Sequence, residues 1–173
     1  PIPGSFTHAV LERVTKGLDE SPHTHTVNDL YASGFDPVFT DADALQFLHK
    51  SLPEEVLEAA DPRAAVLEAA KGPVRRHLAR RWLRGKSKRE IAAALWERRP
   101  KDVQAQQALV AEADGLIFVA PIYWMAFPAI LKGWFERVFA YGFAYTLNSE
   151  GWRGDLEGRI PLLSQEKALI VTP

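Results

Sequence analysis

A short aromatic segment holds the residues whose types and spacing could do chemistry: Pro121, Ile122, Tyr123, Trp124 and Met125. The apolar run 116–120 precedes it and predicts a strand that is covered on both faces. Ligands of open α/β sheets bind at the carboxyl ends of such strands. A planar aromatic cofactor at this place would meet main-chain N–H donors from residues 122–125 and the ring of Trp124. The alternative is that Tyr123 and Trp124 are core aromatics beneath a loop.

Strands and helices must alternate along the chain to position this segment. Residues 23–28 (HTHTVN) are rich in β-branched side chains and predict a strand, as does the apolar run 168–172. A helix is expected from Pro128, with a broad apolar face and an outward pair formed by Lys132 and Glu136. Parallel strands joined through helices predict an α/β fold, a three-layer sandwich with a mainly parallel sheet.

The remaining parts of the chain are predicted to be mostly helical. Ser5 is expected to cap the first helix, and the loop 29–37 keeps three large side chains that indicate packing onto a neighbour. From residue 41 to residue 114 the pattern predicts helices that are interrupted at prolines. Within that region, residues 87–90 (SKRE) have the form of a capping box, and Asp102 is expected to cap the next helix.

Composition limits the function classes. The chain has 173 residues, 47% of them hydrophobic and 25% charged, which is typical of one globular domain. A net charge of −1 favours neither a nucleic-acid partner nor a membrane partner for the chain as a whole. The absence of cysteine excludes disulfides, a thiol nucleophile and thiolate metal sites. No apolar run is long enough to span a bilayer and the first residues do not resemble a signal peptide, so a cytoplasmic protein is expected.

One long motif carries a family resemblance. Residues 128–139 (PAILKGWFERVF), together with the preceding PIYW and the following FAY at 143–145, resemble the flavodoxin-like NAD(P)H:quinone oxidoreductases. Three further segments are similar to that family in the same order: 1–6 (PIPGSF), 29–37 (DLYASGFDP) and 167–172. The resemblance implies a single flavin-binding domain over residues 1–173.

Against that family, this sequence shows both gaps and an addition. The family's first strand with its histidine, and the glycine turn, tyrosine and histidine after the last strand, have no counterpart here, so truncation at both ends is expected. The connection after the second loop is longer than the family's, which predicts a helical insertion at about 62–101.

The resemblance also implies roles for individual residues. Ser5, Phe6 and Thr7 would hold the flavin phosphate at a helix start, where backbone N–H groups and the helix dipole favour an anion. The segment 121–125 would border the isoalloxazine ring. Trp124 would also line the pocket for nicotinamide and quinone, and Tyr145 would contribute to it, in this family commonly across a dimer interface.

The implied reaction is hydride transfer from NAD(P)H through a flavin, FAD or FMN, to a quinone or a similar aromatic acceptor. The flavin would perform the chemistry, and the protein would position the rings. A homodimer is implied as well, with the region from Trp134 to Tyr145 at its interface. A non-catalytic flavodoxin-like regulatory or binding subunit is the alternative.

A basic segment is open to three interpretations. Residues 71–89 contain nine of the chain's 21 Lys and Arg residues and no acid. We favour a solvated helical face, in which Val74, Leu78 and Trp82 form an apolar stripe beneath the arginines. The alternatives are an anion site, for example for a dinucleotide phosphate, and a nucleic-acid surface. Residues 85–95 resemble the first helix of a helix-turn-helix, but a short turn and a basic second helix are not evident.

Two weaker patterns remain. His23 and His25 lie two residues apart and could bind metal, but no third ligand is evident nearby, so a plain strand is favoured. Pro1 could act as an amino-terminal base of the kind found in small tautomerases, yet nothing else in the sequence resembles those enzymes.

Overall fold

The computed structural model describes Ile2 and residues 4–173, so Pro1 and Pro3 lie outside the described residues. The chain divides into two compact units. The first, here called the sheet unit, comprises the described residues up to Phe39 together with Ala105–Val138 and Ser164–Pro173. The second, the helical unit, comprises Thr40–Gln104 and Phe139–Leu163.

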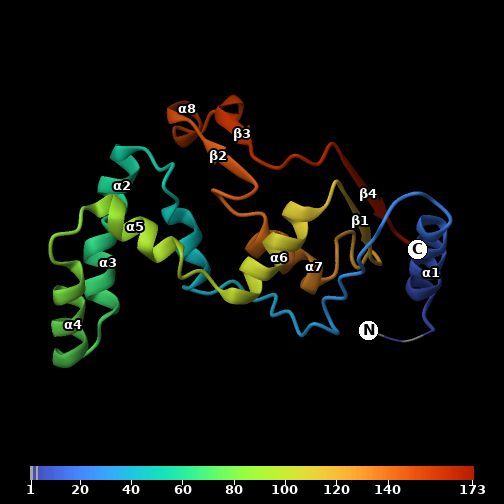
Figure 1. Ribbon diagram of the computed structural model, residues 1–173, viewed down its shortest axis with the longest axis horizontal. Coiled ribbons are helices and arrows are strands. Elements are labelled where there is room, and N and C mark those ends of the chain that lie inside the picture. The colour runs from blue at the N-terminus through green and yellow to red at the C-terminus, as the bar shows by residue number, and fades with distance from the viewer. Residues whose placement is uncertain (1, 3) are drawn as a thin grey trace. The chain divides into compact units, whose positions relative to one another are not determined.

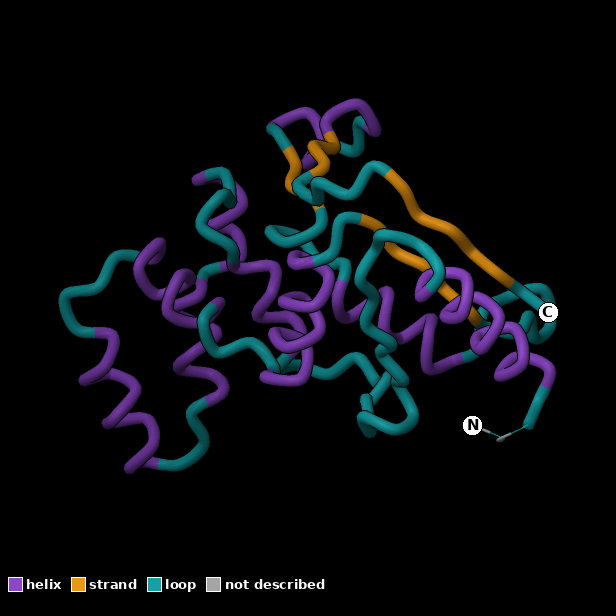
Figure 2. The backbone as a smooth tube through the Cα atoms, turned by 45° about the vertical axis from the view of Figure 1, so that its right-hand side comes forward, coloured by secondary structure: helices purple, strands orange, loops and turns teal. Residues whose placement is uncertain are grey.

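The sheet unit is built on two parallel strands, β1 (Gly115–Val119) and β4 (Lys167–Val171), which run side by side in Figure 2. Their register pairs Ile117 with Leu169. Figure 1 shows α1 (Phe6–Asp19) on one side of this pair and α7 (Ala129–Val138) on the other. A strand pair between helices is the arrangement that alternating strands and helices predict.

The helical unit contains most of the remaining elements. A 3-10 helix η1 (Asp43–Leu48) leads into α2 (Glu54–Ala60), α3 (Pro62–Ala69), α4 (Pro73–Leu83) and α5 (Lys88–Trp96). An antiparallel hairpin, β2 (Tyr145–Leu147) and β3 (Arg159–Pro161), completes it, with the short helices α8 (Ser149–Trp152) and η2 (Leu156–Gly158) in its connection. Helix α6 (Lys101–Glu112) begins in this unit and ends in the sheet unit.

Local sequence signals explain several helix starts. Pro62 and Pro73 occupy the first turns of α3 and α4, where a missing N–H costs nothing. The capping box is confirmed: Ser87 Oγ accepts from the Glu90 N–H, and the Glu90 carboxylate accepts from the Ser87 N–H. Asp102 is not a cap, because α6 already begins at Lys101 and Asp102 lies inside its first turn.

Two strand predictions need correction. Residues 23–28 form no strand, because no described segment makes a hydrogen-bonded ladder with them. β1 and β4 exist within one residue of their predicted positions, but they are not covered on both faces. Ile117, Leu169 and Ile170 are exposed, since the described ladder has two strands and the helices pack mainly on β1.

Candidate functional site

The carboxyl ends of β1 and β4 define one edge of the sheet unit, because parallel strands end on the same side. The aromatic segment 121–125 follows directly on β1 at this edge. Both strands also run toward the end of the unit at which α1 begins (Figures 1 and 2). The structure therefore brings three predicted site segments to one end of the sheet unit: the start of α1, residues 121–125 and the end of β4.

Residues 123–126 form a tight turn that sets the shape of the aromatic segment. The Tyr123 N–H donates to Ala126 O (2.8 Å), and the Ala126 N–H donates back to Tyr123 O (3.0 Å). The two residues between them, Trp124 and Met125, have φ values of 50° and 65°. Positive φ at both central residues is the mark of a type I′ hairpin turn, which usually contains Gly, Asn or Asp. A Trp and a Met in this backbone conformation store strain, and stored strain concentrates at functional sites.

The turn also leaves backbone donors free. Within the described residues, the N–H groups of Ile122, Trp124 and Met125 have no hydrogen-bond acceptor. The Tyr123 N–H, by contrast, is occupied by Ala126 O, so the predicted set of donors from residues 122–125 shrinks to three. Such donors match the carbonyl and nitrogen atoms along one edge of a flat heterocycle.

The side chains of the turn point into solvent. Trp124 is 101% exposed and Met125 is 97% exposed, and Ile122 and Tyr123 are exposed as well. The interpretation of Tyr123 and Trp124 as core aromatics beneath a loop is therefore wrong. An exposed group of large apolar side chains on a strained, hydrogen-bonded turn indicates a binding surface.

The start of α1 supplies a second group of donors. Ser5 precedes the helix with an extended backbone, and its side chain does not cap the helix but lies 2.9 Å from His8 Nδ1. The first turn contains no acidic residue, and the N–H groups of Phe6, Thr7 and His8 meet no acceptor in the part of the chain that is described. Unoccupied donors and the positive end of the helix dipole suit a phosphate group.

Helix α7 packs against the residues on either side of the aromatic turn. The Phe118 ring of β1 packs against Trp134 and Phe135, with ring centroids 5.8 and 4.9 Å apart. Phe127, next to the turn, packs on Phe135 at 5.8 Å. Trp134 is buried, and its Nε1–H donates to Gln106 Oε1 (2.7 Å). The apolar face that the sequence predicts for α7 is thus confirmed, and so is its outward ion pair between Lys132 and Glu136.

The loop 29–37 packs onto α7 through Phe35, one of the three large side chains that predict packing, whereas Tyr31 is exposed. Phe35 is buried with the Arg137 guanidinium 5.2 Å from its ring centre, and Arg137 donates to the carbonyl of Asp36. Gly133 permits this approach, because a Cβ at that position would lie 2.2 Å from Pro37 O. Sequence reasoning missed Gly133, although one glycine amid the large side chains of an apolar helix face is a signal of close packing.

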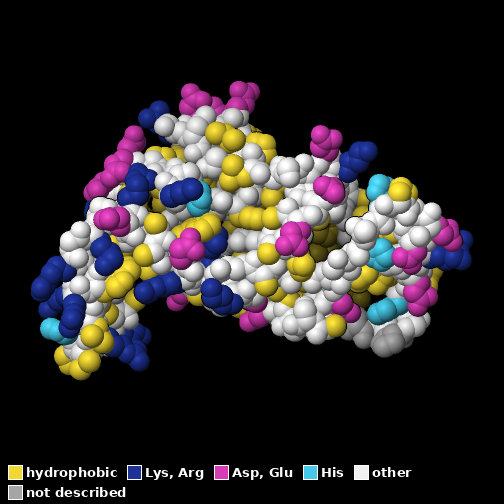
Figure 3. Space-filling view, viewed as in Figure 1, with side chains coloured by type: hydrophobic (Ala, Val, Ile, Leu, Met, Phe, Trp, Pro, Cys, Tyr) yellow, Lys and Arg dark blue, Asp and Glu magenta, His cyan; other side chains and the backbone are white. Residues whose placement is uncertain are grey.

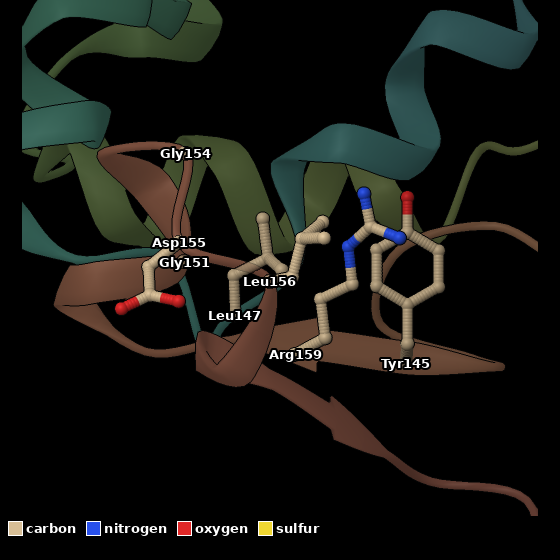
Figure 4. A pocket seen from close by; sticks show the side chains of 7 residues that line it. All are labelled: Tyr145, Leu147, Gly151, Gly154, Asp155, Leu156 and Arg159. Atoms are coloured by element: carbon tan, nitrogen blue, oxygen red, sulfur yellow. The ribbon is translucent and has the colours of Figure 1, made fainter.

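Tyr145 belongs to the other unit. It lies on β2 and lines a cavity of about 320 Å³ within the helical unit, together with Leu147, Leu156 and Arg159. Figure 4 shows these four side chains on one side of the hairpin, with the Asp155 carboxylate turned away from them. For Tyr145, Leu147 and Arg159 the common side follows from the register, which pairs Leu147 with Arg159, and from the period of two along β2. Arg159 escaped notice in the sequence, since only the hairpin register brings it to this cavity.

A polar cluster supports the strand that carries Tyr145. Ser51 Oγ lies 2.9 Å from the Tyr141 hydroxyl and 3.1 Å from Thr146 Oγ1. His49 Nδ1 lies 2.8 Å from the same Ser51 Oγ, and the His49 ring packs edge-on against Trp96 and Tyr141. Burial, followed by the nearby charges of Lys50 and Arg99, holds the pKa of His49 below its ordinary value of 6.5. This imidazole therefore remains neutral at neutral pH.

Comparison with known proteins then decides the family. The sequence matches the family described as having a flavodoxin-like fold over residues 1–172. The chain belongs to this flavodoxin-like family. The predicted fold class, a flavodoxin-like α/β fold with a parallel sheet, is thereby confirmed.

Individual flavodoxin-like relatives are similar over nearly the whole chain. NAD(P)H dehydrogenase (quinone) 1 of Cavia porcellus is 32% identical over 160 residues, which cover 92% of this chain and 47% of the relative. Human ribosyldihydronicotinamide dehydrogenase (quinone) is 32% identical over 162 residues, 94% of this chain and 57% of the relative. The chain thus spans about half the length of the curated relatives it matches.

Among solved structures, an NAD(P)H:quinone oxidoreductase from Methanothermobacter marburgensis superposes with a TM-score of 0.61 at 25% identity, covering 99% of this chain and 59% of that one. Smu.1420 from Streptococcus mutans UA159 gives a TM-score of 0.57 at 28% identity, covering 99% of this chain and 62% of that one. Both likenesses extend over both compact units of this flavodoxin-like chain.

Other predicted features have different outcomes. His25 Nδ1 lies 3.7 Å from Asp19 Oδ1, and the described residues contain no group of three His, Cys, Asp or Glu side chains that could hold a metal ion. None of the described helices has the length and apolar character needed to cross a membrane. A short connection does follow α5, contrary to expectation, but α6 carries a single cation, Lys101, and so lacks the basic character of a recognition helix.

Proposed function

We propose that this chain is the flavin-binding core of an NAD(P)H:quinone oxidoreductase, with residues 1–173 as one domain and a helical insertion at about 62–101. The two curated relatives and the protein from Methanothermobacter marburgensis are quinone-linked oxidoreductases by name, and the site geometry is compatible with the flavin that their fold implies. Compatibility rests on free backbone donors at two places, the start of α1 and the turn 123–126.

Each group of donors would bind a different part of the flavin. The N–H groups of Phe6, Thr7 and His8 would bind its phosphate, helped by the dipole of α1. The N–H groups of Ile122, Trp124 and Met125 would donate to the polar edge of the ring system. A bound flavin supplies the capacity to accept a hydride from NAD(P)H and to pass two electrons to an acceptor.

The exposed side chains of the turn would shield the ring and hold the acceptor. Trp124 offers a flat apolar face, and Met125 offers an adaptable thioether that fits irregular aromatic surfaces. Exclusion of water by these side chains would strengthen the backbone hydrogen bonds beside them. Tyr145, which lies in the helical unit, would contribute to the pocket for nicotinamide and quinone across a homodimer interface. A quinone or a similar flat acceptor would be the substrate.

The observation that carries this proposal is the fully exposed Trp124 on a strained turn whose neighbouring N–H groups have no acceptor. The direct test is the visible absorbance of the purified chain after addition of flavin, followed by bleaching with NADH or NADPH under anaerobic conditions. A chain that takes up neither FAD nor FMN contradicts the proposal. A chain that binds flavin but is not bleached supports the non-catalytic binding subunit instead.

A charge substitution at the start of α1 separates ligand binding from helix stability. Thr7→Glu places an acid in the first turn, which should stabilise the isolated helix by about 0.3–1 kcal/mol through the helix dipole. The same carboxylate would repel a flavin phosphate and weaken flavin binding roughly tenfold or more. Thr15→Glu, on the same helix but away from its start, is the matched control and should leave flavin affinity unchanged.

The finer properties are also proposals. We expect a homodimer, although Trp134 itself is buried within its own chain and does not present its side chain at a surface. Sedimentation of the flavin-loaded protein tests this expectation. Separate titrations with FAD and FMN, and with NADH and NADPH, assign the cofactor and the donor. A cytoplasmic location remains a prediction from composition, to be checked by cell fractionation.

A further inference from the structure

Helix α4 of the helical unit carries an unusual concentration of positive charge. Residues 71–84 contain six Lys and Arg side chains and no Asp or Glu. In the described structure none of the six forms an ion pair with a carboxylate. These residues are Lys71, Arg75, Arg76, Arg80, Arg81 and Arg84.

The basic residues that follow α4 behave differently. Lys88 Nζ lies 2.5 Å from Glu58 Oε2, and Arg89 Nη2 lies 2.6 Å from Glu54 Oε2. Lys86 lies over the Trp82 ring, 4.9 Å from its centre. The positive charge of residues 86–89 is therefore largely engaged within the unit, whereas that of residues 71–84 is available to a partner.

An exposed apolar stripe runs between the unpaired arginines. Val74 is 71% exposed and Leu78 is 57% exposed, one helical turn apart. Arg75 and Arg81 lie three residues before and after Leu78, so they flank it on the same face. Val74 and Leu78 are therefore not beneath the arginines, as the sequence pattern suggested, but open to solvent beside them, whereas Trp82, the third residue of the predicted stripe, is half-buried against the core cluster. In Figure 3 hydrophobic side chains surrounded by Lys and Arg side chains are visible at the end of the unit where Figure 1 places α4.

The opposite side of α4 is fixed. Leu83 is buried and packs in one cluster with Ile91 and Leu95 of α5. Helix α4 is thus docked on the side of Leu83 and presents Val74, Leu78 and the flanking arginines to solvent. An amphipathic helix with unpaired cations beside exposed aliphatic side chains has the character of an interfacial membrane helix.

We propose that α4 is a docking surface for an anionic lipid bilayer, in which Val74 and Leu78 enter the headgroup region while the arginines bind lipid phosphates. Charge complementarity favours this partner, because anionic lipids attract basic residues close to the surface. A nucleic-acid duplex would use the arginines but would leave the two aliphatic side chains without an apolar environment. This inference goes beyond the proposed redox function and would bring the protein to a phase in which lipid-soluble quinones dissolve.

Vesicle co-sedimentation of the full chain tests the proposal. We expect binding to vesicles of equal parts phosphatidylglycerol and phosphatidylcholine, weakening with added salt, and little binding to phosphatidylcholine alone. Arg75→Gln combined with Arg81→Gln should lower the partition coefficient about 30-fold, or about fivefold for each cation removed. Leu78→Ser should lower it by about tenfold, because a Leu side chain no longer leaves water.

A matched pair of substitutions elsewhere provides the control. Arg13→Gln with Lys101→Gln removes the same charge from exposed positions on α1 and α6 and should leave vesicle binding within about twofold of the unsubstituted chain. Equal losses in the control and α4 variants would overturn the proposal, as would equal binding to neutral vesicles or no binding to anionic ones. Binding of a short DNA duplex that depends on Arg75 and Arg81 but not on Leu78, without vesicle binding, would overturn it in favour of nucleic acid.

Discussion

Two tryptophans only ten residues apart, Trp124 and Trp134, have opposite environments. Trp124 is 101% exposed at the tip of a strained turn, whereas Trp134 is 4% exposed and donates a hydrogen bond to Gln106. Helix α7 uses its aromatic side chains to fix the position of the turn, and the turn leaves its own side chains open to solvent. The exposed tip of the turn thus depends for its shape on the buried aromatic packing next to it.

The different environments follow from the local backbone. In α7, Leu131, Trp134 and Val138 recur at helical spacing and so share one buried face. In the turn 123–126, the two central residues project away from the reciprocal hydrogen bonds that join its ends. Residues of similar apolar character in the same segment are thus either buried in the core or exposed to solvent, depending on whether they lie on the inner face of a helix or at the tip of a turn.

The largest expected effect separates the two tryptophans directly. Trp134→Ala should lower the free energy of unfolding by about 3–5 kcal/mol, because it empties part of the core and removes a donor from Gln106. Trp124→Ala should change it by less than about 0.5 kcal/mol and should instead reduce flavin binding or quinone reduction. Urea unfolding of both variants checks the contrast, with Tyr31→Ala as the control for an exposed aromatic. Equal losses of stability would show that the turn is also part of the core.

The second prediction concerns how tightly the support packs. Gly133→Ala places a methyl group 2.2 Å from Pro37 O and 2.6 Å from Pro37 Cβ, so the loop 29–37 must move away from α7. A loss of about 1–3 kcal/mol in unfolding free energy is expected. Gly17→Ala, where a Cβ meets nothing within 4 Å on α1, is the control and should be neutral or slightly stabilising. A neutral Gly133→Ala variant would mean that the loop is not held against α7.

These contrasts also show what the sequence could predict. The strands β1 and β4, the helix α7 with its apolar face and outward ion pair, and the capping box of α5 were all evident, because each depends on spacing within one short segment. The prediction of a strand at 23–28 was wrong, because β-branched residues favour a strand only where a neighbouring strand pairs with them.

The site was predictable as a segment but not as a shape. The local sequence did not predict positive φ values at Trp124 and Met125, since neither residue type favours them. The sequence therefore also did not predict that the Tyr123 N–H would be occupied within the turn. The exposure of Val74 and Leu78 escaped prediction for a related reason. An apolar stripe identifies a helix face, but only tertiary packing decides whether that face is the buried one.

The strain in the turn gives a smaller effect of opposite sign. Met125→Gly removes a side chain that is 97% exposed and relieves its left-handed backbone, which costs an ordinary residue about 1–2 kcal/mol. The greater chain entropy of glycine in the unfolded state offsets part of this relief, so a gain of up to about 1 kcal/mol in unfolding free energy is expected. The matched substitution Met125→Ala keeps the strain and should give no gain. A turn that becomes more stable but binds flavin less well would show that strain is retained there for recognition.

The smallest effect extends the comparison to the helical unit, where the half-buried Tyr145 is the counterpart of Trp124 and the cluster around His49 is its support. Because burial lowers the pKa of His49 below 6.5, the unfolded chain binds its proton more readily than the folded one. The stabilisation from neutral His49 is therefore fully present above the ordinary pKa and is lost as the pH falls through the lowered one.

Unfolding free energies measured between about pH 8 and about pH 5 should fall more steeply for the unsubstituted chain than for His49→Gln, which cannot titrate. His77, exposed on α4, provides the matched substitution His77→Gln, and this variant should keep the acid sensitivity of the unsubstituted chain. Parallel pH curves for the unsubstituted chain and His49→Gln would mean that the imidazole does not support β2 in its neutral form.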